Sequence, residues 1–107
     1  MIQVQIRWAI NPFRGDKFAA GWAPAAEAAL DYGATHWSFA RAKDGRLDFM
    51  QTAIFPSKAD FERYWYSERI AEYRIELAGT YQVPILPTYW EVIGAGEAVS
   101  PAPVEPS

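Results

Sequence analysis

The pattern that most constrains this chain is the regular alternation of large apolar residues with polar or small ones over its first ten positions. The apolar positions are Ile2, Val4, Ile6, Trp8 and Ile10. Because successive side chains of a β-strand point to opposite faces, this period of two predicts a strand with one buried face. The intervening positions include Gln3, Gln5 and Arg7, so we expect the second face of this strand to be polar.

Two helices are predicted, one after this first strand and one later in the chain. The first covers residues 15–32 and ends at Gly33, a residue type that suits the left-handed position after a helix. The second covers residues 57–77, with Ser57 as the expected N-cap and Asp60 three residues later. The residues that the first helix should bury are Phe18, Trp22, Ala26, Ala29 and Leu30.

Three further strands complete the pattern. Residues 35–43 and 46–55 read as two strands joined at Asp44 and Gly45, a residue pair that favours a tight hairpin turn. Residues 83–93 read as a last strand, placed at a sheet edge because two prolines lie near its start. The order is that of a ferredoxin-like βαββαβ unit. We therefore predict an α+β fold, with two helices on one face of a four-stranded antiparallel sheet.

Length and composition limit the organisation and the class of function. The 107 residues predict one domain over residues 1–94 and a disordered Pro-rich tail over residues 95–107. A net charge of −3 without a run of basic residues argues against nucleic-acid binding. Without cysteine and with one histidine, the usual zinc and thiolate sites are excluded. No segment resembles a membrane span or a signal peptide, so we expect a cytoplasmic protein without membrane contact.

The face of the sheet away from the helices is where a site is expected. Gln3, Gln5 and Arg7 should point to it from the first strand. Gln51 is expected to share this face, and His36 also if the register of the second strand has the same parity. The alternative is a face that is simply solvated. The aromatic content of 16% favours a lined pocket or an intersubunit interface, although an aromatic core would also account for it.

These features resemble one known family of proteins. The resemblance rests on the element order, the Asp44-Gly45 hairpin, and the residues Phe55, Ser57, Phe61, Tyr64, Trp65 and Tyr89 to Ile93. The chain resembles the dimeric α/β-barrel superfamily, in particular proteins related to the antibiotic biosynthesis monooxygenases, over residues 1–94. The resemblance implies a homodimer formed by sheet-to-sheet packing. It also implies a pocket between sheet and helices, or inside the barrel, for a small aromatic ligand.

Two other activities of this superfamily fit the chain less well. Haem degraders of this type use an Asn on the first strand, a Trp on the second helix and a ligating His about ten residues later. Trp65 matches, but Arg7 and Ile75 occupy the other two regions. The mutarotases carry a His before a Trp-Pro segment; residues 21–24 resemble that segment, but the His is missing.

The resemblance therefore implies a small monooxygenase that works without metal or flavin on an aromatic or polyketide-like compound. Such a reaction needs a base, a cation for the developing anion and an aromatic pocket. His36 is the expected base and Arg7 the expected cation. The expected substrate-binding residues are Gln5, Trp22, Gln51, Tyr64 and Trp65.

Several alternatives remain open from the sequence. A lone histidine on a strand can be structural, and Arg7 can form an ion pair with Glu91 or Asp48 across strands. Tyr64 and Trp65 at helical spacing can be core residues rather than a substrate platform. A non-catalytic dimer that binds a small ligand, or an isomerase of the same superfamily, would share the same elements.

Overall fold

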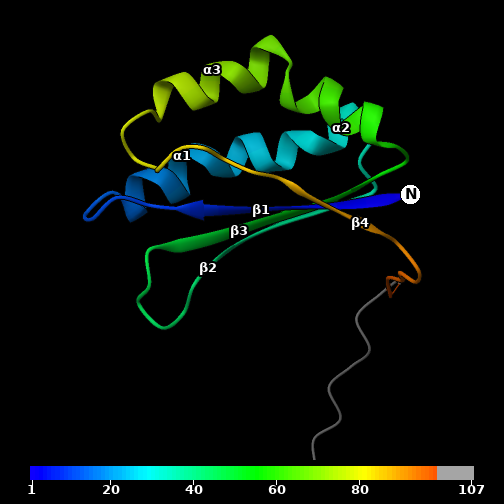
Figure 1. Cartoon of the computed structure of the whole chain (residues 1–107), viewed down its shortest axis with the longest axis horizontal. Helices are drawn as coiled ribbons and strands as arrows, with labels where there is room; N and C mark the ends of the chain where they lie inside the picture. Colours follow the sequence, from blue (N-terminus) through cyan, green and yellow to red (C-terminus); the bar gives the residue numbers. More distant parts are fainter. Residues whose placement is uncertain (99–107) are drawn as a thin grey trace, which may run out of the picture.

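The computed structural model describes residues 1–98, which form a two-layer α+β fold with the helices on one side of a sheet (Figure 1). The strands are β1 (Ile2–Ala9), β2 (His36–Arg41), β3 (Asp48–Phe55) and β4 (Thr88–Glu91). The helices are α1 (Gly15–Glu27), the 3-10 helix η1 (Ala28–Tyr32), α2 (Lys58–Trp65) and α3 (Glu68–Glu76). The strand order is β2-β3-β1-β4 with antiparallel pairs, which confirms the predicted fold class.

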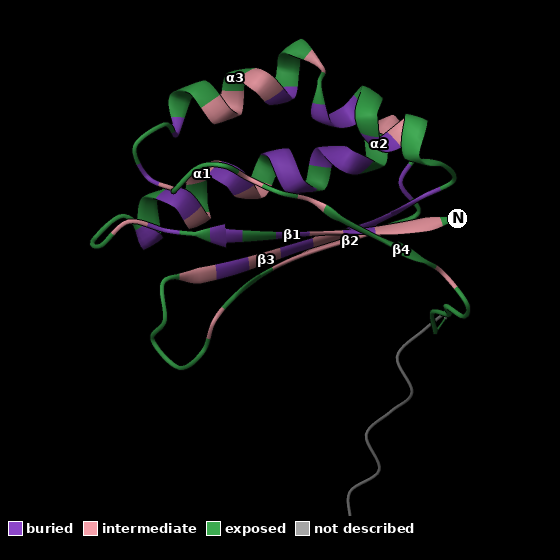
Figure 2. Ribbon diagram, viewed as in Figure 1, coloured by how far each residue is buried: buried purple, intermediate pink, exposed green. Residues whose placement is uncertain are grey.

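The core lies between the helices and one face of the sheet, where buried positions gather (Figure 2). Val4, Ile6 and Trp8 of β1 are each at most 2% exposed, as the alternation predicts. Aromatic rings fill much of this layer: the Trp8 ring centroid lies 4.7 Å from that of Trp22 and 5.0 Å from that of Phe18. Much of the aromatic content is therefore core.

The first helical segment changes geometry near its end. Pro24 lies inside α1, and the chain passes into η1 at Ala28. Gly33 follows η1 with a φ of 97°, in the left-handed region predicted for it. The prediction that Leu30 points inward is wrong, because its side chain is 45% exposed. The change to a tighter 3-10 turn rotates this residue away from the face that α1 buries.

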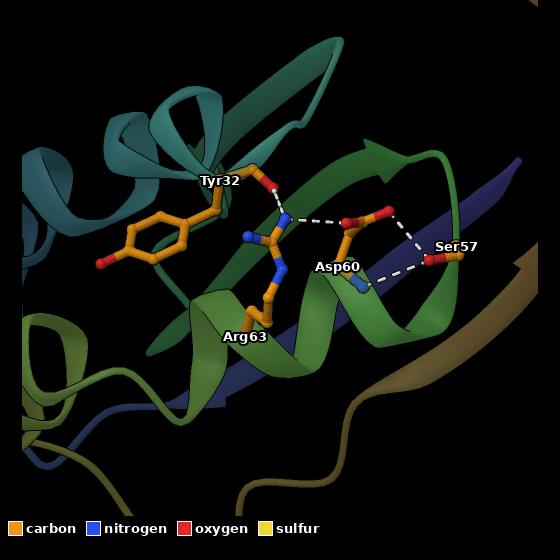
Figure 3. A network of polar contacts seen from close by, with 4 residues as sticks. All are labelled: Tyr32, Ser57, Asp60 and Arg63. Carbon is orange, nitrogen blue, oxygen red and sulfur yellow. Dashed lines mark hydrogen bonds and ion pairs between the residues drawn. The ribbon is translucent and has the colours of Figure 1, made fainter.

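The second helical segment is two helices rather than one. Ser57 caps α2 as predicted, accepting a hydrogen bond from the Asp60 amide and donating its hydroxyl to the Asp60 carboxylate (Figure 3). Arg63 pairs with this carboxylate at 2.8 Å and reaches the Tyr32 carbonyl, which ties α2 to η1. Ser67 then accepts from an amide in the first turn of α3 and so starts a new helix.

The β2–β3 connection is longer than predicted. The amide of Ala42 donates to the Asp48 carbonyl, so residues 43–47 form the loop instead of Asp44 and Gly45 alone. This odd-length loop pairs Phe39 with Gln51. A two-residue loop would have paired Ser38 with Gln51 and reversed the facing of one strand relative to the other.

The last strand is also shorter than predicted and lies at the sheet edge. The amide of Gln82 donates to the Ala9 carbonyl, after which residues 83–87 leave the sheet before β4 begins. Within residues 1–98, no helix combines the length and apolar character needed to cross a bilayer. The tail predicted over residues 95–107 falls mostly outside the described residues.

Candidate functional site

The sheet face turned away from the helices is called the open face here. Its side chains form rows that run across the strands. The first row is His36, Ile54, Gln3 and Trp90. The second row is Ser38, Thr52, Gln5 and Thr88. The third row is Ala40, Met50 and Arg7. Because directly opposed residues of paired strands share a face, this register places His36, Gln3, Gln5 and Arg7 on the open face.

A cavity of about 540 Å³ lies at the first row and is called the His36 cavity. Its lining residues are Met1, Gln3, Thr35, His36, Thr52, Ile54 and residues 94–97. The imidazole is exposed, whereas Ile54 is only 8% exposed and gives the cavity an apolar surface. Its volume falls within the range of about 300–1,000 Å³ typical of small-molecule pockets, and its lining combines polar side chains with the apolar Met1 and Ile54.

Several residues of this cavity were not predicted from the sequence. Thr52 and Ile54 lie on the open face because the β1–β3 register places them opposite Gln5 and Gln3. Residues 94–97 form one wall although they lie beyond β4. They are three small residues followed by Glu97, whose sequence carries no signal of a site.

Arg7 lies on the same face but away from His36. It is four residues along β1 from Gln3, or about 13 Å at about 3.3 Å per residue. It faces Met50 and lines a second cavity of about 190 Å³, called the Arg7 cavity. Within residues 1–98 it forms no ion pair with Glu91 or Asp48. One protomer therefore does not bring the predicted base and cation together.

Gln51 is not on the open face, and that prediction is wrong. It pairs with Ile6, faces the helices and is 2% exposed. Its Oε1 accepts from the indole Nε1–H groups of Trp22 at 2.8 Å and Trp8 at 3.4 Å. Its Nε2 donates to the hydroxyl of Tyr64 at 3.0 Å. The physical reason is the β1–β3 register, which places Gln51 directly opposite Ile6 on the buried face of β1.

Tyr64 completes this group, which we call the Gln51 network. Its hydroxyl donates to the Ala25 carbonyl at 2.6 Å, close to the point where α1 passes into η1. Burial raises the pKa of Tyr64 well above its usual range. The phenol therefore stays protonated at neutral pH and acts as a hydrogen-bond donor, not as a base.

Four of the five predicted substrate-binding residues therefore lie in the core, and only Gln5 lies on the open face. Trp22, Gln51 and Tyr64 use their polar atoms on one another. Trp65 is 7% exposed and stacks on Phe61. The guanidinium carbon of Arg74 lies 4.5 Å from the centroid of the Trp65 ring. Among the described residues, no buried side-chain nitrogen or oxygen lacks a hydrogen-bond partner. The contacts of Trp22, Gln51, Tyr64 and Trp65 are therefore made within the core.

Metal-ligating side chains do not gather in the part of the chain described. No group of three or more His, Asp or Glu residues within residues 1–98 is placed to hold an ion.

Comparisons with solved structures support the fold. No family model matches the chain, and no curated protein matches it. Among solved structures, a Nitrosomonas europaea protein named as a candidate antibiotic biosynthesis monooxygenase aligns with a TM-score of 0.79 at 10% identity. The alignment covers 88% of this chain and 100% of that one.

Two further structures give the same result. A protein of that name from Bordetella bronchiseptica aligns with a TM-score of 0.73 at 16% identity, over 86% of this chain and 96% of its own. A cofactor-independent oxygenase from Streptomyces nogalater aligns with a TM-score of 0.72 at 12% identity, over 88% of this chain and 94% of its own. With its sheet order and helix layer, the chain has the ferredoxin-like fold that these solved structures share.

Proposed function

We propose that this protein is a small cofactor-independent monooxygenase that acts on an aromatic or polyketide-like compound in the His36 cavity. The observation that carries the proposal is the place of the chain's single histidine, in the wall of a cavity of about 540 Å³. An imidazole can accept a proton near neutral pH, which suits it to a base. The fold shared with a cofactor-independent oxygenase at 12% identity is consistent with this chemistry and does not specify a substrate.

The reaction requires an electron-rich substrate with an acidic proton, such as an anthrone or a phenol. His36 takes the proton, and the resulting carbanion or phenolate transfers electrons to dioxygen, which forms a carbon–oxygen bond. The protonated His36 returns its proton to the peroxide anion, and the resulting hydroperoxide loses water. In an anthrone this step leaves a carbonyl in place of the CH₂ group, and in a phenol it leaves a quinone carbonyl in place of a ring C–H group. One O₂ is consumed, with one oxygen atom in the product and one in water. Gln3 offers an amide donor to the anion from the same cavity.

The proposal includes a homodimer in which a second copy covers the open face. A covered cavity would exclude water and so strengthen the contacts of the substrate anion. The half-buried polar residues of the second row, Ser38, Thr52 and Gln5, would lie between the two sheets.

One observation favours a second candidate, a dimer that binds a small ligand without turnover. Within residues 1–98, no side chain or carbonyl forms a hydrogen bond with the His36 imidazole. A catalytic histidine usually has such a partner to fix its orientation.

Native mass spectrometry tests the proposal in one experiment. The protein is incubated with an anthrone in air and in nitrogen, and both the assembly and the released small molecule are weighed. The proposal predicts twice the chain mass, and in air a product that has gained one oxygen and lost two hydrogens. A dimer that retains unchanged anthrone in air would support the non-catalytic binder. A monomer without bound compound would contradict both.

A further inference from the structure

Trp90 is the exposed member of the chain's five tryptophans. Its side chain is 55% exposed, whereas the others lie in the core or pack against it: Trp8, Trp22, Trp37 and Trp65. None of the aromatic ring pairs or cation–π contacts within residues 1–98 includes Trp90. Packing of the core therefore does not account for this large side chain.

The register of β4 places Trp90 beside the His36 cavity. It is directly opposite Gln3, which lines the cavity, and opposed residues of this kind have Cβ atoms about 4.5–5.5 Å apart. Trp90 itself does not line the cavity but ends the first row, three strand spacings from His36, or about 14 Å. The row therefore has an imidazole at one end and an indole at the other, with Ile54 and Gln3 between them.

The indole ring of Trp90 is held in one orientation by its own strand. Its Nε1–H donates to the Thr88 hydroxyl at 3.0 Å, and this hydroxyl donates to the Gln5 carbonyl at 3.3 Å. Thr88 lies two residues earlier on β4 and so shares the open face. Because the polar atom of the indole is already paired, a ligand can cover the ring without leaving a donor unsatisfied. A ring that is already oriented also loses less side-chain freedom on binding.

We propose that Trp90 determines the ligand specificity of the His36 cavity, by stacking on the far ring of a ligand whose hydroxyl end lies at the imidazole. A single-ring ligand is too short to reach both residues across about 14 Å. The first row would therefore favour ligands with two or more rings over ligands with one ring. This inference rests on the proposed ligand site at His36, but not on the oxidation reaction.

Binding of phenol, 2-naphthol and 2-anthrol, measured by isothermal titration calorimetry under nitrogen, tests this role. The three probes carry the same hydroxyl on one, two and three linearly fused rings, and nitrogen prevents turnover. Trp90→Ala is expected to weaken the binding of 2-anthrol about fivefold or more and that of phenol less than about twofold, because only the longer probe reaches the indole. Trp90→Phe keeps an aromatic face, so W90F should bind 2-anthrol more tightly than W90A does.

Tyr66→Ala is the matched control, because Tyr66 is another exposed aromatic residue and follows α2 in the helix layer (Figure 1). Y66A should bind all three probes like the wild type. Equal weakening of phenol and 2-anthrol in W90A, or unchanged binding of 2-anthrol, would overturn the role of Trp90 and leave His36 as the site. A halved particle mass of W90A in light scattering would make Trp90 a contact between two copies and also overturn it. Failure of the wild type to bind any probe would overturn the proposed function as well.

Discussion

Replacing His36 with alanine is expected to lower the rate of anthrone oxidation by about a hundredfold or more, because general-base catalysis typically contributes about 10²–10⁴-fold. The imidazole of His36 lines the cavity, and histidine is the residue type most often used as a general base in enzymes. The rate is measured as oxygen uptake with an electrode, at saturating substrate. Since His36 is exposed, the free energy of unfolding should change by less than about 0.5 kcal/mol.

His36→Gln is the matched control for this change. Glutamine has a similar reach and can donate and accept hydrogen bonds, but it cannot act as a base at neutral pH. If His36 is the base, H36Q should be as slow as H36A. If H36Q oxidises anthrone at the wild-type rate while H36A does not, His36 positions the substrate instead. A wild-type rate in H36A would exclude His36 from the mechanism.

Replacing Gln51 with alanine is expected to lower the free energy of unfolding by about 3–4 kcal/mol. The substitution removes the acceptor of the buried Trp22 indole at 2.8 Å and the donor to the Tyr64 hydroxyl at 3.0 Å. It also leaves a cavity in a layer packed with aromatic rings. Urea unfolding followed by far-UV circular dichroism measures the difference.

Gln5→Ala is the matched control on the same sheet. Gln5 lies on the open face and is half-buried, and none of its side-chain atoms forms a hydrogen bond within residues 1–98. Q5A should therefore stay within about 0.5 kcal/mol of wild type. Similar losses in Q51A and Q5A would show that the Gln51 network does not stabilise the core.

The fold could be predicted from the sequence because its main signals are local. The alternation over β1, the glycine after η1 and the Ser57 cap each act within a few residues, and each is present in the structure. The sheet order then follows from the element order alone.

The candidate site depends on two registers that the sequence does not state, that of β3 against β1 and that of β2 against β3. Asp44 and Gly45 suggest a two-residue turn, whereas residues 43–47 form the loop. The β1–β3 register places Gln51 opposite Ile6 and so in the core, and the longer loop then leaves His36 and Ser38 on the open face. The hydrogen bonds of Trp22 and Tyr64 to Gln51 could not be predicted either, because the spacing of these residues in the sequence gives no indication that they converge on one side chain.

Other features depend on contacts between distant segments. The break between α2 and α3 requires Ser67 to act as a cap, although the apolar pattern continues through it. Residues 94–97 reach the His36 cavity only because β4 pairs with β1 and directs the chain past Gln3. Neither arrangement leaves a periodic pattern in the sequence.

The central claim is that a small molecule binds at the open face and not in the aromatic core. The most direct measurement is a titration with 2-naphthol followed by the His36 ring signal and by the tryptophan indole N–H signals, assigned with Trp→Phe variants. The account predicts shifts at His36 and at Trp90, which shares its row, with little change at the Trp8 and Trp22 indoles. Shifts at Trp8 and Trp22 without a response at His36 would place the ligand in the core and contradict the account.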